Sequence, residues 1–267
     1  MNKRNSLIMD IGGISILLKS DKDDFLAQIR DIYSNFISND SNPVLLIEME
    51  ELTEKKGPDL NLDSPIVTNN KNLYSFFGQY FSGEFNLDTL DGKLKYTNCK
   101  SLNNYLRIVY SLILLNENGF LVHAASLIKN DSGFLFPGKS GTGKTTITRL
   151  STDSTPLSDE VSLVKMVNGE YHVFGTPFWN NLIVTGENTH ACLKHIYLPK
   201  KDKKNYRKSV NSIRVLENLI PNVLFFLDDN ELKMQLFDIC YDFATTIPSY
   251  ELHFLPDPSF WSVINER

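Results

Sequence analysis

Residues 133–146 read GFLFPGKSGTGKTT, an apolar run followed by a glycine-rich segment that ends in a lysine and two threonines. The second half of this stretch fits the phosphate-binding pattern G-x-x-x-x-G-K-S/T, between an apolar run that predicts a strand and a helical pattern at 145–150. Glycines permit positive φ, so successive backbone N–H groups can point into one concavity, and the start of a helix adds partial positive charge. We expect this loop to bind the phosphates of a nucleoside triphosphate rather than to be a glycine-rich turn that binds nothing.

The lysine and the threonines of the loop have separate expected roles. Lys144 is expected to reach the β- and γ-phosphates, which makes it a candidate catalytic residue as well. Thr145 offers a hydroxyl to Mg²⁺, a hard cation that takes oxygen ligands. The expected nucleotide-binding residues are Gly138, Ser140, Gly141, Thr142, Gly143, Lys144, Thr145 and Thr146.

Two adjacent carboxylates, Asp159 and Glu160, follow the loop closely and come just before a predicted strand. The chain could fold back so that carboxylates in this position lie beside the phosphate-binding loop. One could hold Mg²⁺ through water, and the other could accept a hydrogen bond from an attacking hydroxyl. A charged turn at the end of a strand is the alternative, and the residues alone leave both open.

Four short motifs around the loop carry a family resemblance. They are HAAS at 123–126, GFLFP at 133–137, LSDE at 157–160 and GTPF at 175–178. With the loop, they resemble the HPr kinase-like superfamily, which includes HPr kinase/phosphorylase and is related in fold to ATP-dependent phosphoenolpyruvate carboxykinase. The motif-level match covers about 120–180. The layout of nearly the whole chain, including PSYELHF at 248–254, is similar to smaller HPr-kinase-related proteins often linked to peptide modification, but it is less specific.

The resemblance implies an α/β fold with two parts. It implies an HPr kinase/phosphoenolpyruvate carboxykinase-like P-loop core with a mixed β-sheet, preceded by a β-rich α+β N-terminal part. We expect the N-terminal part at 1–100 and the kinase-like domain at 101–267. Kinases of this superfamily are often oligomeric, and the sequence leaves the oligomeric state open.

The resemblance also implies an activity: an ATP-dependent kinase that uses Mg²⁺ and transfers the γ-phosphoryl group to a hydroxyl. Asp159 matches the acid proposed as general base toward a serine, and Glu160 matches the acid that helps to hold the metal. His123 matches a histidine near the phosphates, although a buried histidine satisfied by hydrogen bonds is the alternative. The expected acceptor is a peptide, a small protein or a metabolite. The signature that recognises HPr is not found downstream, which argues against HPr itself.

Two other functions remain open. Residues 223–229, VLFFLDD, look like the Walker B strand of an ATPase, with Asp228 as the metal-holding acid. Against this, the apolar spacing around the segment is helical, which predicts a buried helix ending at a charged surface. The other alternative is a nucleotide-dependent module that binds a peptide without phosphorylating it. A pure binder has no need of a base, so Asp159 weighs against it.

Composition and charge exclude several classes of protein. The formal net charge of −5 argues against nucleic-acid binding, although the run KKDKK at 200–204 is either a solvated loop or a patch for an acidic substrate or nucleotide. Cys99, Cys192 and Cys240 form no CxxC pair, which argues against a disulfide framework and a structural zinc site. The first apolar stretch is interrupted by charged residues, so we expect no signal peptide, no membrane span and a cytoplasmic protein.

Residue patterns predict the elements outside the loop. They predict a strand–turn–strand at 7–18, helices at 25–37 and 102–113, strands at 43–48, 120–128, 133–136, 161–167, 170–175, 195–198 and 250–255, and helical structure at 212–244 broken near Pro221. Residues 52–72 are predicted to be loop, Asp91-Gly92 to turn a hairpin within 80–96, and Gly119 to cap the second helix.

Overall fold

The computed structural model describes residues 5–40, 42–52, 65–178 and 186–265. Contacts divide the chain into two compact units. The first comprises Met1–Ile113 and Phe225–Asp228, and the second comprises Leu114–Leu224 and Asp229–Arg267. Each unit combines helices with a sheet that contains both parallel and antiparallel pairs, so the fold is α/β with mixed sheets.

The sheet of the first unit has the strand order β1-β2-β3-β7-β6-β5-β4. The β2–β3 and β3–β7 pairs are parallel, and the other pairs are antiparallel. The strands are β1 (Asn5–Ile11), β2 (Ile14–Ser20), β3 (Leu45–Glu51), β4 (Ile66–Asn70), β5 (Leu73–Phe77), β6 (Phe81–Asn86) and β7 (Asp91–Tyr96).

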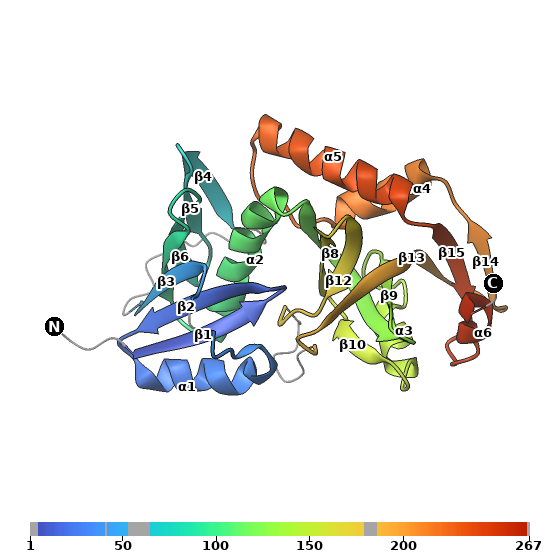
Figure 1. Ribbon diagram of the computed structural model, residues 1–267, viewed down its shortest axis with the longest axis horizontal. Helices are drawn as coiled ribbons and strands as arrows, with labels where there is room; N and C mark the ends of the chain where they lie inside the picture. Colours follow the sequence, from blue (N-terminus) through green and yellow to red (C-terminus); the bar gives the residue numbers. More distant parts are fainter. Residues whose placement is uncertain (1–4, 41, 53–64, 179–185, 266–267) are drawn as a thin grey trace. The chain divides into compact units, whose positions relative to one another are not determined.

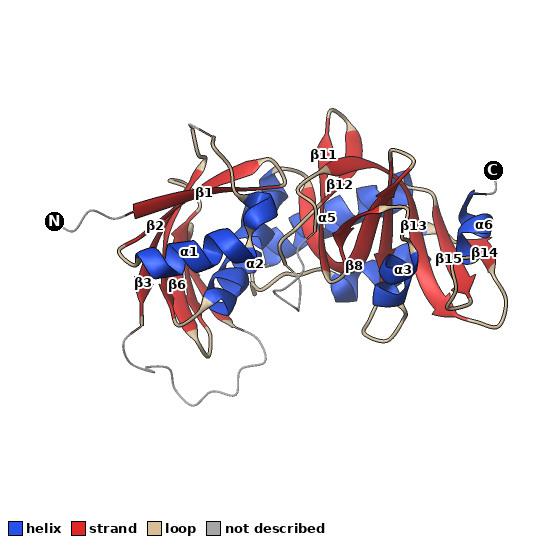
Figure 2. Cartoon of the chain, turned by 90° about the horizontal axis from the view of Figure 1, so that it is seen from below, coloured by secondary structure: helices blue, strands red, loops and turns tan. Residues whose placement is uncertain are grey.

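The helices of this unit cover one face of the sheet, as Figure 2 shows. On β7, Gly92 and Tyr96 share a face because alternate side chains of a strand point the same way. Phe25 of α1 stacks on Tyr96 with ring centroids 3.6 Å apart. A Cβ at Gly92 would lie 2.1 Å from the hydroxyl of Tyr105 in α2, so glycine makes room for that helix. The helical segments are α1 (Asp23–Ile32), the 3-10 turn η1 (Ser34–Phe36) and α2 (Cys99–Asn116).

Two predictions for this unit need correction. The hairpin forms, but its turn is at 87–90, where the Asn86 side chain accepts backbone N–H bonds and Leu90 takes a φ of 56°. Asp91-Gly92 belong to β7 instead. The predicted loop at 52–72 contains β4, and its residues 53–64 lie outside the described residues.

The end of α2 also differs from the prediction. The helix ends at Asn116, and Asn118 rather than Gly119 takes the left-handed conformation, with a φ of 47°. Gly119 opens the next strand instead. A Cβ there would lie 2.6 Å from the Cβ of Lys165, so this glycine permits two strands to approach closely.

The sheet of the second unit has the order β10-β8-β11-β12-β13-β15-β14, and β9 pairs with both β8 and β13. Strand β13 is parallel to β9 and to β15. The residue patterns did not predict β10 and β14, and they predicted only the central residues 195–198 of β13. The strands are β8 (Gly119–Lys129), β9 (Ser132–Pro137), β10 (Thr155–Ser158), β11 (Val161–Val167), β12 (Glu170–Phe174), β13 (His190–Lys201), β14 (Tyr206–Ser209) and β15 (Ser249–Phe254).

Helices pack on both faces of this sheet, α5 on one and α3 on the other (Figure 1). Phe243 of α5 makes edge contacts with Phe120 and Tyr171, at centroid distances of 5.2 and 5.0 Å. On the opposite face, Ile147 of α3 and Trp261 of α6 belong to one buried cluster. The helical segments are α3 (Lys144–Leu150), α4 (Ser212–Leu219), the 3-10 turn η2 (Ile220–Asn222), α5 (Asn230–Thr246) and α6 (Phe260–Asn265).

Residues 224–229 form neither the expected Walker B strand nor the expected helix. Val223 makes a single antiparallel bridge to Val122, and the chain then runs without regular structure to α5. Asp229 caps that helix, because its carboxylate accepts the N–H groups of Glu231 and Leu232 at 2.9 and 3.1 Å. A carboxylate at this position accepts hydrogen bonds from the free N–H groups of the first helical turn. This capping role accounts for Asp229 without any role in metal binding.

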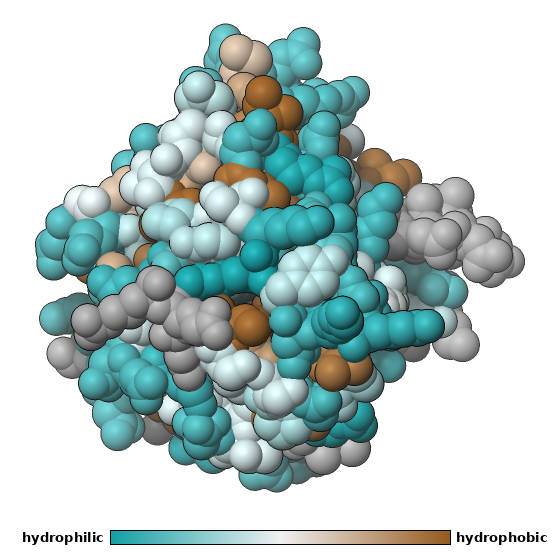
Figure 3. All heavy atoms as spheres, turned by 90° about the vertical axis from the view of Figure 1, so that its right-hand side faces the viewer, coloured by the Kyte–Doolittle hydropathy of each residue, from teal (hydrophilic) through white to brown (hydrophobic). Residues whose placement is uncertain are grey.

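The surface around β14 and α6 is mostly hydrophilic, with small separate apolar areas (Figure 3). This agrees with the many charged residues at 200–208. Within the described residues, no helix is both long and apolar enough to cross a membrane.

Asp229→Ala is expected to destabilise the protein by about 1 kcal/mol, because the first turn of α5 loses its cap. Asp229→Asn is the matched control, since asparagine also accepts these hydrogen bonds and should leave stability nearly unchanged. Urea unfolding of both variants measures the difference. Equal losses in the two variants would show that capping is not the role of Asp229.

Candidate functional site

Strand β8 joins the two parts of the candidate site at adjacent residues. On one edge, Ala124 pairs with Pro137, and the N–H of Gly138 donates to the carbonyl of His123 at 3.4 Å. On the other edge, the N–H of Ala124 donates to the carbonyl of Glu160 at 3.0 Å. The phosphate loop at 138–145 and the turn formed by Asp159 and Glu160, the acid turn, are apart in sequence. They therefore lie on either side of one short segment of β8.

The loop between β9 and α3 depends on glycine at two positions. Gly141 and Gly143 take φ values of 86° and 107°, which L side chains rarely adopt. A Cβ on Gly143 would also lie 2.6 Å from the Phe254 ring. The loop is therefore folded tightly against the end of β15, and larger residues would change its path.

Lys144 and the acid turn influence each other electrostatically. The ammonium of Lys144 donates to the carbonyls of Gly138 and Lys139, the latter at 3.0 Å. Burial lowers its pKa, and the charges of Glu160 and Asp159 act in the opposite direction. Burial raises the pKa of Asp159, and the charge of Lys144 opposes this rise. A partly desolvated lysine and a partly desolvated aspartate thus share one site.

A cavity of about 500 Å³ lies over the loop, which is within the usual size range for small-molecule sites. It brings together every predicted site residue except Thr142, whose hydroxyl donates to the carbonyl of Lys139 at 2.9 Å. The lining residues are His123, Gly138, Lys139, Ser140, Gly141, Gly143, Lys144, Thr145, Thr146, Asp159, Glu160, Lys201 and Asn222.

Two buried hydroxyls hold the acid turn in position. The Ser158 hydroxyl accepts the N–H of Glu160 at 3.2 Å and donates to the carbonyl of Val161 at 2.9 Å. The Thr176 hydroxyl donates to the same carbonyl, and both side chains are fully buried. These contacts bring the LSDE and GTPF motifs together and fix the backbone that carries both acids.

Lys201 and Asn222 were not predicted as individual site residues. Lys201 ends β13, whose parallel neighbours β9 and β15 end at the same edge of the sheet, where ligands commonly bind in α/β folds. The basic run at 200–204 was the available signal, but it did not distinguish Lys201 from Lys200, which pairs with Glu251 at 2.7 Å. Asn222 lies in η2, and no pattern marked it.

The residues that line the cavity fit a magnesium–nucleotide complex. The hydroxyl of Thr145 and the carboxylates of Asp159 and Glu160 are oxygen ligands of the kind that Mg²⁺ prefers. Lys144 and Lys201 provide positive charge for phosphates. His123, which is partly exposed, lines the same cavity, so it could also contact a phosphate.

Comparison with known proteins adds one similarity. The family described as SynChlorMet cassette protein ScmC matches residues 89–199, which is less than half of the chain. The matched part includes His123, the phosphate loop and both acids of the turn, and the description states no reaction. No curated protein matches the chain.

MgATP is expected to raise the melting temperature of the wild-type protein, and Lys144→Ala is expected to abolish this shift. Ligand binding to the folded state stabilises by about 2.7 kcal/mol at a hundredfold excess over Kd. Differential scanning fluorimetry with and without MgATP measures the shift. Lys203→Ala, a change at an exposed lysine outside the cavity lining, is the control and should respond like wild type. An equal shift in the wild type and Lys144→Ala would contradict the loop assignment.

Proposed function

We propose that this chain is an ATP-dependent kinase of the HPr kinase-like type. It transfers the γ-phosphoryl group to a hydroxyl, most simply that of a serine, on a peptide, a small protein or a metabolite. The observation that carries the proposal is the shared cavity: a phosphate loop, its lysine and a paired-acid turn meet around one strand.

The chain supplies fixed positive groups for the phosphates. Phosphoryl transfer proceeds through a loose transition state, so the protein mainly positions the reactants and balances charge. The loop N–H groups and Lys144 are suited to the β- and γ-phosphates, and Lys201 faces the same cavity from the end of β13. When bound with the nucleotide, Mg²⁺ would neutralise phosphate charge, with Thr145 and Glu160 as candidate protein ligands among the lining residues.

Asp159 is the candidate general base. In the proposed step, the acceptor oxygen bonds to the γ-phosphorus while the bond to the bridging β-phosphate oxygen breaks. The hydroxyl proton passes to the Asp159 carboxylate, and the products are ADP and a phosphate ester. Because burial raises the pKa of Asp159, the carboxylate is protonated at a higher pH than an ordinary aspartate. Transfer should therefore be lost as pH falls through that raised value.

The same observations argue against Asp228 as the metal-holding acid of a conventional ATPase. An ATPase of the Walker B type needs an acid at the end of a strand beside the loop. The segment before Asp228 is not a strand, whereas Asp159 and Glu160 line the cavity with the loop. A base held in this position also favours transfer over simple nucleotide-dependent binding.

Asp159→Asn is expected to keep MgATP binding and to lose transfer to a hydroxyl by roughly 10²–10⁴-fold, the usual contribution of a general base. Asparagine has nearly the same shape and accepts a hydrogen bond, but it cannot take the proton. Label transfer from γ-labelled ATP to a panel of serine-containing peptides measures the rate. Calorimetric titration with MgATP measures binding in parallel.

Asp228→Asn is the matched control and should transfer at the wild-type rate. A near-normal rate in Asp159→Asn would remove this residue from catalysis, and loss of MgATP binding would make it mainly a metal ligand. Release of inorganic phosphate without any labelled acceptor, combined with inactivity of Asp228→Asn, would favour the ATPase.

A further inference from the structure

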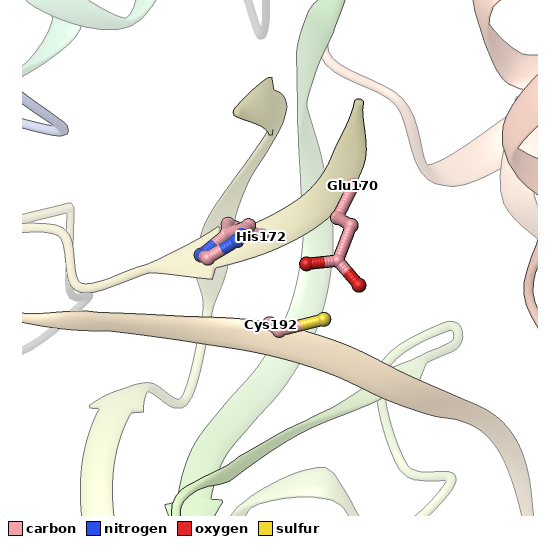
Figure 4. Close-up of side chains that lie close together, drawn as sticks. All are labelled: Glu170, His172 and Cys192. Atoms are coloured by element: carbon pink, nitrogen blue, oxygen red, sulfur yellow. The ribbon is translucent and has the colours of Figure 1, made fainter. Parts of the chain in front are cut away.

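Three side chains with metal-binding atoms converge on the β12–β13 ladder, away from the phosphate loop in the sequence. Glu170 and His172 lie two residues apart on β12, so they share a face of the strand. Cys192 is the direct antiparallel partner of His172 on β13 and lies on the same face. One carboxylate oxygen, one ring nitrogen and the thiol sulfur all lie within 4.8 Å of one another. Figure 4 shows the Glu170 carboxylate beside the Cys192 sulfur.

These distances are close to those of a metal site. Zinc binds sulfur at about 2.3 Å and nitrogen or oxygen at about 2.0–2.2 Å, so tetrahedral ligand atoms lie roughly 3.5 Å apart. Glu170 is exposed, and His172 and Cys192 are partly exposed. Their side chains can therefore close the remaining gap by rotation, without repacking the core, and an ion can enter from solvent.

His190 adds a second feature of metal sites. Its Nδ1 lies 3.0 Å from Nδ1 of His172, and it is two residues before Cys192 on the same face of β13. Histidines that bind metals usually hydrogen-bond through their other ring nitrogen, which fixes the orientation of the ring. When Nδ1 of His172 donates to His190, its Nε2 carries the lone pair that a metal requires.

The ligand types select the metal. Thiolate and imidazole favour zinc over magnesium or calcium, which prefer oxygen ligands. Among the described residues, two lysines lie near these ligands. Lys194, which is exposed, follows Cys192 by two residues on β13 and acts on His172 through its charge. Lys165 is the direct β11 partner of His172. The Lys165 ammonium pairs with Glu117 at 3.0 Å, so its charge is already balanced by a carboxylate.

We propose that Glu170, His172 and Cys192 bind one Zn²⁺ ion on the β12–β13 ladder, with His190 orienting His172. The fourth position is open to water. The missing CxxC pair argues only against zinc sites that use two neighbouring cysteines. The proposed site uses one cysteine, so that argument does not apply to it. The ion links two strands that are joined by a long connection, so it should stabilise the second unit in proportion to its occupancy.

The test is metal binding by the full-length wild-type chain. Competition between the protein and a chromophoric chelator measures Zn²⁺ affinity, and Co²⁺ in place of Zn²⁺ reports a thiolate ligand through its near-ultraviolet charge-transfer band. We expect one ion per chain and a thiolate–cobalt band. Cys192→Ser should abolish the band and weaken Zn²⁺ binding by at least roughly tenfold, and Glu170→Gln and His172→Gln should weaken binding similarly.

Two controls separate this site from other binding. Cys99→Ser is the matched cysteine control and should retain the cobalt band. The double change Asp159→Asn/Glu160→Gln removes acids of the phosphate site and should leave Zn²⁺ affinity unchanged. Circular dichroism verifies that each variant is folded. A cobalt band or a zinc affinity that survives Cys192→Ser, or zinc binding lost only in the Asp159→Asn/Glu160→Gln variant, would overturn the proposal.

Discussion

The backbone pairing of β8 at His123 and Ala124 is the constraint on which the candidate site depends. One edge of this short segment holds the start of the phosphate loop, and the other edge holds the turn that carries both acids. Backbone pairing, rather than contacts between flexible side chains, therefore fixes the position of the loop relative to the turn. The separation between the phosphate loop and the acid turn is therefore set mainly by the spacing of neighbouring strands, about 4.8 Å per strand, which varies little among proteins.

The hydroxyls of Ser158 and Thr176 extend this constraint. Both are buried, and both donate to the carbonyl of Val161, directly after the acid turn. The turn can thus hold Asp159 in a partly desolvated position, where burial raises its pKa while Lys144 limits the rise. Keeping the charges of Lys144 and Asp159 partly out of water costs free energy when the site holds no ligand. In a bound magnesium–nucleotide complex, the phosphates would balance the lysine and the cation would balance the carboxylate.

Local patterns predicted the loop, the strand before it, the helix after it and much of the α/β arrangement. These predictions were right because the conformation around Gly143 and Lys144 is determined by residues that are close together in the sequence. They failed where partners distant in sequence decide the outcome: Gly92 makes room for Tyr105 rather than turning a hairpin, and the segment before Asp229 stays irregular despite its apolar residues. Lys201 enters the site only because β13 ends beside β9.

The most direct measurement is a crystal structure of the chain with Mg²⁺ and a non-hydrolysable ATP analogue. We expect the γ-phosphate between Lys144 and Asp159, the metal on Thr145 and Glu160, and Lys201 on a phosphate oxygen. We also expect space for an acceptor hydroxyl between the Asp159 carboxylate and the γ-phosphorus. A nucleotide bound elsewhere on the chain, or triphosphate in the loop with the acid turn facing away from it, would contradict the account.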